Sequence, residues 1–561
     1  MSFAIYYARE GYDISQPKLM GRNAAGASFI RGFLQYGAGN LASCLVETDE
    51  DASFFKEELT LHSEKKQPSI LRKTQLQKLS DVGGLYYPGP NIGDLAYQRA
   101  SASLKHDSWS LCGITHTTSS ARAMDSLVSL ITSPVQPWDS VICTSTAVKK
   151  NVEAVLQSRV DELRDRLGIK KIVLPMLPVI PLGVHTEDFN FTAQHRNDAR
   201  AELNISAEAI IVLYTGRLSF HAKAHPLAMY QALEHAANTT RKEVVLIECG
   251  WHANEFIENS FSAAAKLAAP SVRVITLDGR KAENREKAWA GADVFCSLSD
   301  NIQETFGIVP IEAMAAGLPV VTSDWDGYKD SVREGIDGFR IPTIAPSPGS
   351  MGDLAHRHAL GIDTYDMYCG HSSSLVAVHA RKLANAFIAL FNSSELRTKM
   401  GLAGREHAIK KYDWRSIIPL YEELWDEQTS IRIAAKKACE EGNIGKSTRI
   451  AAWPGRLDPT IAFANYPTIH LSPNTRLVLT YPSAAKALDK LTKFKGLAMV
   501  DYARYVFPTP DELKSVIEVA EKFLPGGSSA AQLVANIEPQ RRPYVLRGLA
   551  WLCKLGLLEF V

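Results

Sequence analysis

The chain has 561 residues and a mass of 61.7 kDa, and its 62 Lys and Arg residues against 61 Asp and Glu give a formal net charge of +1. Hydrophobic residues make up 46% of the composition and charged residues 22%. This balance is ordinary for a folded globular protein, and it excludes a disordered chain and a protein that coats nucleic acid through bulk charge. At about 150 residues per domain, the length predicts three or four domains.

We expect neither a membrane-spanning segment nor a secretory signal. No run approaches the roughly 18 consecutive apolar residues that a spanning helix needs, and the first residues have no basic region ahead of an apolar core. The eight cysteines are scattered and form no C-x-x-C pair. These observations argue against zinc and disulfide scaffolds and favour a cytoplasmic protein, with contact at the inner face of a membrane left open.

Up to residue 428, short apolar runs alternate with longer amphipathic stretches, which is the pattern of parallel α/β units. The first half contains five strand candidates, at 3–8, 41–47, 109–115, 140–145 and 177–183. The second half contains five more, at 209–216, 243–250, 272–279, 293–299 and 318–324. We therefore predict two Rossmann-like halves, 1–190 and 191–411, with a loop-rich insertion at 343–374 and a helix at 412–428 that crosses back onto the first half.

The character of the chain changes after residue 430. Residues 430–465 read as a linker, and 466–561 as a small, mostly helical domain. Within it, helices are predicted after Pro510, after Gly526-Gly527 and over 541–555, followed by a short terminal strand. The last part resembles a winged-helix unit. Its acidic and basic residues balance, so a protein partner or acceptor fits it better than nucleic acid, and a packed structural cap is the alternative.

The most informative segment is ETFGIVPIEAMAAGLPVV at 304–321. A strand ends before it and a helix is predicted from about Gly307, so the free N–H groups of Gly307, Ile308 and Val309 would suit a phosphate. The carboxylates of Glu304 and Glu312 would suit neutral hydroxyls, as on a sugar or ribose. The structural alternative is that Glu304 caps the helix and Glu312 is solvated.

A second segment, TGRLSFHAKAHP at 215–226, also follows a strand directly. Arg217 offers a bidentate fork and Lys223 a point charge, a combination that suits a diphosphate. A solvated loop is the alternative. His221 and His225 have no partner at metal-ligand spacing and read as loop residues.

Two further segments lie close to predicted strands of the first half. GITHTTS at 113–119 puts His116 at the carboxyl end of a strand, where open α/β sheets bind ligands. A structural histidine is the equal alternative. KLMGRNAAGASFI at 18–30 lacks the full G-x-G-x-x-G spacing, so it predicts no dinucleotide fingerprint. Gly21 and Gly26 there either approach a phosphate or form a plain turn.

Taken in order, these motifs resemble the retaining, GT-B-fold glycosyltransferases of the "group 1" (family 4-like) family. The resemblance covers residues 1–428 and also includes ICTSTAVKKNVEAVL at 142–156, VIPLGVHTEDF at 179–189 and KKYDWRSIIPLYEELW at 410–425. It departs from the family where the Arg217–Lys223 spacing is one residue longer, where His185 replaces a common Asp, and where Asp326 replaces a common Gly.

The resemblance implies an α/β GT-B fold, with two Rossmann-like domains facing a cleft, and a role for each motif. Glu304 would hold donor-sugar hydroxyls, Glu312 the ribose, and Arg217 with Lys223 the departing diphosphate. His116 would lie beside the donor sugar. The implied catalytic residues are His116, Arg217, Lys223 and Glu304. The implied nucleotide-sugar-binding residues are Gly21, Gly26, Leu277, Asp278, Phe306, Gly307, Ile308, Val309 and Glu312.

The resemblance further implies transfer of a hexose from a nucleotide sugar, UDP-sugar in the first place, with retention and with no cofactor or catalytic metal. Asp324-Trp325-Asp326 imitates the D-x-D metal motif of another fold and is interpreted as coincidence. The acceptor stays open among glycan, lipid, protein and small molecule, and so does peripheral membrane contact through the basic helix at 148–171. The rival hypotheses are another GT-B chemistry, such as a phosphorylase or epimerase, and a non-catalytic regulatory or scaffold protein.

Overall fold

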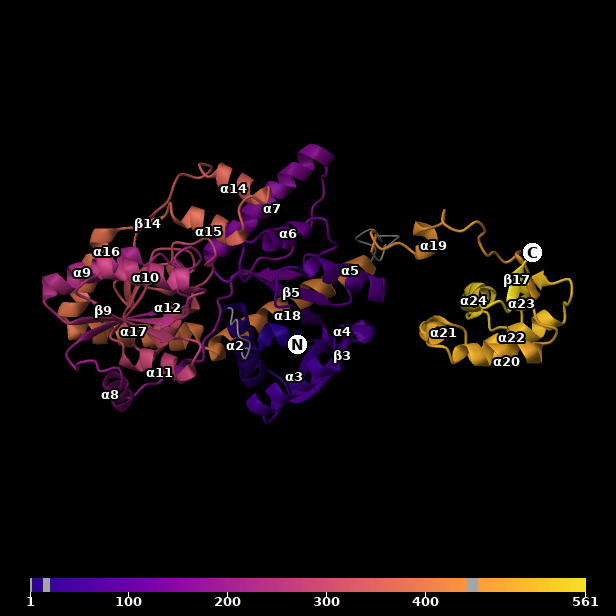
Figure 1. The fold of residues 1–561 in the computed structure, drawn as a ribbon, viewed down its shortest axis with the longest axis horizontal. Helices are drawn as coiled ribbons and strands as arrows, with labels where there is room; N and C mark the ends of the chain where they lie inside the picture. The colour runs from indigo at the N-terminus through magenta and orange to yellow at the C-terminus, as the bar shows by residue number, and fades with distance from the viewer. Residues whose placement is uncertain (1–2, 14–20, 441–452) are drawn as a thin grey trace. The chain divides into compact units, whose positions relative to one another are not determined.

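The computed structural model describes residues 3–13, 21–440 and 453–561 (Figure 1). The chain divides into two compact units, Met1–Pro454 and Gly455–Val561. The first unit contains two parallel six-stranded sheets with helices packed around them, which confirms the predicted α/β GT-B architecture.

The first sheet has the strand order β3-β2-β1-β4-β5-β6, and every neighbouring pair is parallel. Its strands are β1 (Ala4–Tyr7), β2 (Leu41–Val46), β3 (Gln67–Arg72), β4 (Gly84–Tyr86), β5 (Ser110–Ile114) and β6 (Ser140–Ile142). The accompanying helices are α1 (Arg9–Tyr12), α2 (Gly21–Tyr36), α3 (Asp49–His62), η1 (Lys73–Lys78), α4 (Leu79–Val82), α5 (Ile92–Ser103), α6 (Ala121–Ser129) and α7 (Thr146–Leu167).

The second sheet repeats this topology in the order β12-β11-β10-β7-β8-β9, again all parallel. Its strands are β7 (Ile210–Thr215), β8 (Val244–Gly250), β9 (Arg273–Asp278), β10 (Val294–Ser297), β11 (Val320–Ser323) and β12 (Gly338–Ile341). Its helices are η2 (Thr186–Phe189), α8 (Ala193–Glu202), α9 (Leu227–Thr240), α10 (Glu255–Ala268), α11 (Ala282–Gly291), α12 (Ile308–Ala315), α13 (Tyr328–Ser331), α16 (Ala380–Asn392) and α17 (Ser394–Tyr412).

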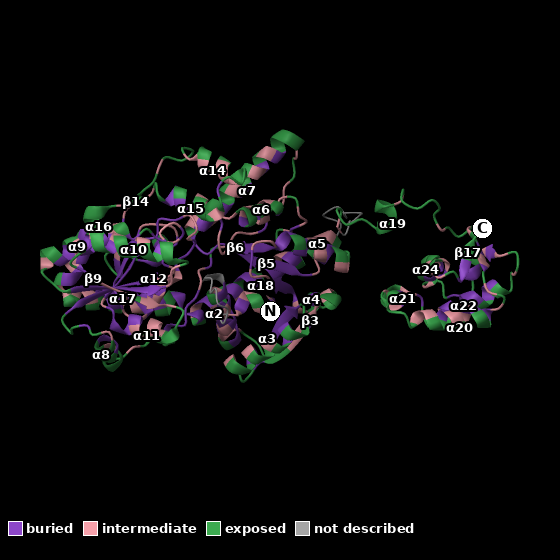
Figure 2. Cartoon of the chain, viewed as in Figure 1, coloured by how far each residue is buried: buried purple, intermediate pink, exposed green. Residues whose placement is uncertain are grey.

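Helix α18 (Trp414–Glu440) crosses back from the second half and packs on the first. Its aromatic side chains are buried against α2 and β1, with Trp425 stacked on Phe3 at 5.1 Å and Tyr421 beside Phe29 at 5.3 Å between ring centroids. Figure 2 shows this helix running along the buried first sheet. The predicted crossover is thus present, with bounds that reach 12 residues beyond the predicted end at 428.

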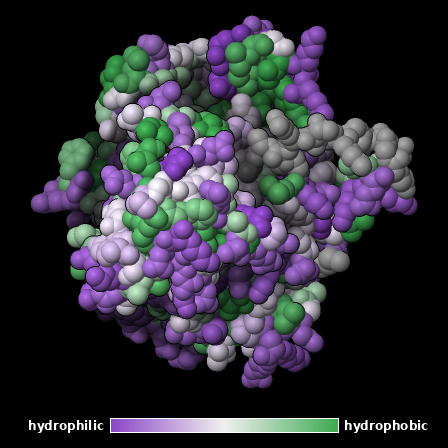
Figure 3. Space-filling model, turned by 90° about the vertical axis from the view of Figure 1, so that its right-hand side faces the viewer, coloured by the Kyte–Doolittle hydropathy of each residue, from purple (hydrophilic) through white to green (hydrophobic). Residues whose placement is uncertain are grey.

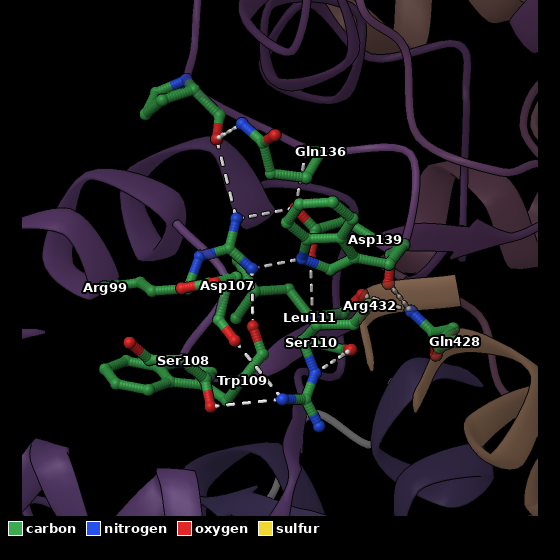
Figure 4. Close-up of polar contacts among 12 residues, drawn as sticks. Arg99, Asp107, Ser108, Trp109, Ser110, Leu111, Gln136, Asp139, Gln428 and Arg432 are labelled. Carbon is green, nitrogen blue, oxygen red and sulfur yellow. Dashed lines mark hydrogen bonds and ion pairs between the residues drawn. The ribbon is translucent and has the colours of Figure 1, made fainter. Parts of the chain in front are cut away.

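Polar anchors explain why α18 continues where a linker was predicted to begin (Figure 4). Gln428 donates to the carbonyl oxygens of Leu111 and Trp138 at 2.8 and 2.9 Å. Arg432 donates to the hydroxyl of Ser110 at 3.1 Å and to backbone carbonyls nearby. These buried contacts anchor α18 as far as Arg432, and the helix continues to Glu440, so the linker prediction is wrong for residues 430–440. Residues 441–452 lie outside the described part of the chain.

Other sequence predictions also need correction. Residues 177–183 form no strand and make only an isolated bridge from Cys143 to Val179, because Pro178 and Pro181 have no N–H to donate to a ladder. Strands β3, β4 and β12 were not predicted. The insertion at 343–374 is less loop-rich than expected: α14 (Gly352–Ala359) and α15 (Tyr365–Ser373) lie between the short antiparallel strands β13 (Thr343–Ile344) and β14 (Ala377–Val378).

The second unit combines helices with a three-stranded antiparallel sheet in the order β16-β15-β17. The three predicted helices are confirmed as α22 (Pro510–Glu521), α23 (Ala530–Leu533) and α24 (Arg542–Lys554), and the terminal strand as β17 (Leu558–Phe560). The remaining elements are α19 (Pro459–Ala462), β15 (Arg476–Leu479), α20 (Ala484–Lys495), α21 (Ala498–Asp501), η3 (Arg504–Val506) and β16 (Ser528–Ser529).

In the face drawn in Figure 3, hydrophobic side chains form separate patches among hydrophilic ones. Within the described ranges, no helix is both long and apolar enough to span a bilayer.

Candidate functional site

The candidate site lies where the strand order of the second sheet reverses. Strands β7 and β10 are neighbours there, and the chain leaves them toward opposite sides of the sheet. Ligands of open α/β sheets bind in the crevice outside such a switch point, at the carboxyl ends of the strands. The loop after β7 contains Arg217 and Lys223, and the loop after β10 contains Glu304. The fold therefore brings both predicted motifs to the same edge.

Lys223 and Glu304 form an ion pair across these two loops. The Lys223 ammonium donates to the Glu304 carboxylate at 2.5 Å, with side-chain exposures of 23% and 9%. Burial would raise the pKa of Glu304, but the charge and hydrogen bond of Lys223, together with backbone N–H groups of Thr305 and Gly307, hold it below its usual value. Glu304 is thus an ionised, nearly enclosed carboxylate beside a cation.

Arg217 is held in the same place by a residue that the sequence did not indicate. Its guanidinium donates to the side-chain oxygen of Gln303 at 2.7 Å and to the carbonyl of Ala222 at 3.4 Å. Gln303 directly precedes Glu304, so adjacent residues of one loop orient both cations. Its position in that loop is the only sequence signal that could have found it.

Gly307 shapes the start of helix α12. Its φ is +77°, and a Cβ there would come within 1.8 Å of the Tyr328 ring, so a side chain fits neither the backbone nor the space. Phe306 before it is buried, and Ile308 and Val309 form the first helical turn. The N–H groups of this turn have no intrahelical acceptor and are available to an anion.

Glu312, one turn further along α12, is an acid whose pKa is raised strongly. Burial raises its pKa to about 7, and the positive charges of Arg285 and Lys223 only partly offset this effect. Among the residues that the structure describes, none forms a hydrogen bond with its carboxyl group. A ligand with hydroxyl donors would supply the missing partners.

His116 comes to this site from the first half of the chain. It follows β5, and its backbone carbonyl accepts a hydrogen bond from the hydroxyl of Thr305 at 2.6 Å. This contact joins the β5 loop to the loop that contains Glu304. The structure therefore brings His116, Arg217, Lys223 and Glu304 into one region between the two sheets.

A second contact between the halves involves the imitation metal motif. Asp326 accepts a hydrogen bond from Ser145, the N-cap of α7, at 3.0 Å, and Asp330 accepts from the Thr146 N–H at 2.6 Å. Asp324 instead faces Arg340 at 3.7 Å. The first and third residues of the D-x-D string thus have different partners. Over the described ranges, no group of three or more His, Cys, Asp or Glu residues is placed to hold a metal ion.

The remaining predicted residues are the two glycines of the first half and the pair at the end of β9. Gly26 is inside α2 rather than in a turn, and a Cβ there would come within 2.6 Å of the Gly11 carbonyl, so it serves close packing of α2 on α1. Gly21 begins α2, and residues 18–20 of that motif are outside the described part of the chain. Leu277 and Asp278 end β9, two strands from β7, where Asp278 pairs with Arg280 at 2.9 Å.

Part of this chain is similar in sequence to known proteins. Residues 195–347 match the family model described as glycosyl transferases group 1. A phosphatidyl-myo-inositol mannosyltransferase of Mycobacterium leprae is 32% identical over 153 residues, covering 26% of this chain and 31% of that protein. A D-inositol 3-phosphate glycosyltransferase of Mycolicibacterium vanbaalenii is 30% identical over 177 residues, covering 29% and 37%. The chain thus spans about a third of the length of these curated relatives.

Among solved structures, Anabaena Alr3699/HepE in complex with UDP is similar with a TM-score of 0.47 and 16% identity, covering 76% of this chain and 99% of that chain. A sucrose-phosphate synthase from Thermosynechococcus elongatus has a TM-score of 0.46 and 16% identity, with the same coverage. The sequence match covers β7 to β12, including the loops with Arg217, Lys223 and Glu304. Over residues 195–347 this chain is therefore similar in sequence to the group 1 glycosyl transferases.

Proposed function

We propose that this chain is a retaining glycosyltransferase that moves a hexose from a nucleotide sugar to a hydroxyl acceptor. The observation that carries the proposal is the meeting of Arg217, Lys223 and Glu304 at the switch point of the second sheet. Two cations and a helix start suit the diphosphate of the donor, and an adjacent ionised carboxylate suits its sugar hydroxyls.

The charges match what the reaction creates. When the bond from the sugar to the diphosphate breaks, negative charge grows on the leaving phosphate and positive character on the sugar ring. Arg217, Lys223 and the N–H groups at the start of α12 stabilise the first, and fixed groups of this kind need little rearrangement during the reaction. Because these side chains already supply positive charge, we propose a mechanism without a catalytic metal. Glu304, released from Lys223 when the diphosphate binds, would accept hydrogen bonds from the sugar.

The residues of the site favour no particular class of acceptor. The names of two relatives refer to inositol-containing compounds, but this chain covers only 31% and 37% of those proteins, so their names do not transfer an acceptor to this protein. We propose uridine as the first base to test, with attack of the acceptor on the face that the diphosphate leaves. His116 would border the reacting sugar from the first half.

Nucleotide binding is expected to raise the melting temperature, and Glu312→Ala should abolish the rise. A ligand at about 100 times its dissociation constant stabilises the native state by about 2.7 kcal/mol. The measurement is thermal unfolding with uridine, guanosine and adenosine diphosphates, with and without chelator. Glu258→Ala, which removes an exposed glutamate of α10, is the matched control and should keep the shift. If none of the three nucleotides shifts the unmodified protein, the donor site is wrong.

Nucleotide affinity is also expected to rise with pH. Below about 7 the Glu312 carboxyl holds a proton, whereas ribose hydroxyls would bind its ionised form, so the dissociation constant should fall by up to about tenfold per pH unit and level off above about 7. In the unliganded chain, Glu312 should make the free energy of unfolding fall as the pH rises. An acid whose pKa is raised on folding loses its contribution to stability as the pH rises through that value. Calorimetric titration across this range measures the dependence.

Glu312→Gln is the control for this pH profile, since the ligand's own phosphate also titrates. The variant keeps the ligand's contribution and removes the protein's, so its profile should be flatter than that of the unmodified chain. Identical profiles would show that Glu312 does not contact the nucleotide.

A further inference from the structure

The helices of the insertion between β13 and β14 lie beyond the part of the chain that matches the family model, which ends at residue 347. Its two helices, α14 and α15, can be followed in Figure 1. A buried carboxylate holds them together: Asp363 accepts from Arg357 at 3.0 and 2.7 Å and lies 3.2 Å from the ring nitrogen of His371. The insertion is thus an ordered element with its own polar core.

One end of α15 contacts the first half of the chain. The Tyr365 hydroxyl lies 2.9 Å from the hydroxyl oxygen of Ser119 and 3.5 Å from that of Thr117, and these two are 3.2 Å apart. Thr117 directly follows His116. The insertion is therefore hydrogen-bonded to the loop that places His116 at the candidate site.

The other end of α15 contacts the loop with the two cations. A Cβ at Gly370 would come within 3.0 Å of the His221 Cβ, so only glycine lets the helix approach this closely without a shift. The His221 carbonyl accepts from Asn301 at 2.7 Å on its other side. Burial raises the pKa of the neighbouring Cys369 thiol, and the charge of Arg217 partly offsets this rise, which agrees with their proximity.

These contacts close a ring of four segments. The β5 loop contacts α15 through Tyr365, α15 contacts the β7 loop at His221, Asn301 ties the β7 loop to the β10 loop, and Thr305 returns to the His116 carbonyl. Arg217, Lys223 and Glu304 belong to segments of this ring. The insertion is therefore part of the wall around the candidate site rather than a remote decoration.

We propose that α15 is a wall of the nucleotide-sugar site and couples the two halves of that site. Gly370 allows the close approach of the loop that contains Arg217 and Lys223. Tyr365 is a positioning residue for the loop that contains His116. This inference rests on the proposed function. A ligand that displaces the cations would then affect residues 115–119 through α15 as well as through the direct Thr305 bond to His116, although those residues belong to the other sheet.

The first test displaces the loop that contains Arg217 and Lys223 by a substitution in α15, outside that loop. The ligand is the nucleoside diphosphate that raises the melting temperature of the unmodified chain. Gly370→Leu should raise its dissociation constant by about tenfold, because displaced cations lose charge-assisted hydrogen bonds. Gly352→Leu is the matched control, since Gly352 lies in the same insertion with no atom within 4 Å of its Cβ position, and it should leave the dissociation constant within twofold. Calorimetric titration of the full chain measures both.

The second test uses a milder change in case Gly370→Leu does not fold. Hydrogen exchange of the amides at 115–119 is measured with and without nucleotide. In the unmodified chain, nucleotide should slow this exchange. In Tyr365→Phe the free protein should exchange there about three- to tenfold faster, as expected for one lost hydrogen bond, and the slowing by nucleotide should become smaller, because only the Thr305 bond to the His116 carbonyl then links this loop to the site. Tyr368 lies in the same helix as Tyr365 and its ring stacks on His358 of α14, so Tyr368→Phe should behave like the unmodified chain.

The outcomes separate this inference from the proposed function. If no nucleotide binds the unmodified chain, the proposed function fails, and the inference fails with it. If nucleotide binds and Gly370→Leu binds equally well, or if Tyr365→Phe keeps the full nucleotide-dependent slowing of the unmodified chain, α15 is not a wall of the site and only the inference is overturned. A purely structural role for Tyr365 would change exchange within the insertion but not its dependence on nucleotide.

Discussion

Lys223→Met is expected to lower the turnover number for sugar transfer or for donor hydrolysis by about 10²–10³-fold, the usual effect of removing one preorganised group that stabilises transition-state charge. The Lys223 ammonium is already oriented by Glu304 at 2.5 Å, so it needs no search for position when the diphosphate departs. Steady-state kinetics with the nucleotide sugar whose base binds the protein measures the effect. Activity within threefold of the unmodified chain would remove Lys223 from the mechanism.

Two controls separate the loss of the cation from its side effects. Lys223→Met leaves Glu304 as an enclosed carboxylate without its partner, which destabilises the loop, so the double variant Lys223→Met with Glu304→Gln should recover melting temperature but not activity. Lys242→Met removes an exposed lysine before β8 and should change neither the melting temperature nor the activity. Lys223→Arg should recover only part of the rate, because a planar fork does not occupy the position of a compact ammonium.

Asp139→Ala is expected to destabilise the first unit by about 3–5 kcal/mol, which is the usual cost of leaving one partner of a buried ion pair alone. Arg99 and Asp139 are both 0% exposed and are joined by two hydrogen bonds of 2.8 Å (Figure 4). The same carboxylate accepts the backbone N–H groups of Leu111 and Gln136 at 2.9 and 2.8 Å. Its removal therefore leaves a buried guanidinium and two backbone donors without their acceptor.

Thermal unfolding measures this loss, and a fall in the melting temperature of about 6 °C or more is expected. Asp161→Ala is the control, because Asp161 pairs with Arg164 at 3.6 Å on the exposed face of α7 and pairs of that kind contribute less than about 1 kcal/mol. A fall no larger than that of the control would show that the buried pair does not hold the strands together. The pair also lies beneath the contacts of Gln428 and Arg432, so α18 should detach from the first sheet at a lower temperature.

The local signals in the chain were sufficient to predict the positions of Lys223, Glu304 and α12, because each depends on the order of a strand, a loop and a helix within about 20 residues. Apolar runs marked β7 and β10, and Gly307 with Gly317 bounded the helix closely. By contrast, β3 and β4 escaped prediction. Their alternation is weak, and their pairing with β2 and β1 depends on residues distant in the chain.

The sequence alone therefore determined which motifs this protein has and that their order follows two α/β halves, and it predicted which groups would neutralise a diphosphate. Only the tertiary structure decided what those motifs touch. The Gln303 contact to Arg217, the Thr305 bond to His116, the seat of Gly370 on His221 and the extension of α18 to Glu440 all join residues from different elements. Periodicity and turn chemistry act over a few residues, whereas these contacts arise when the burial of two sheets brings distant loops together.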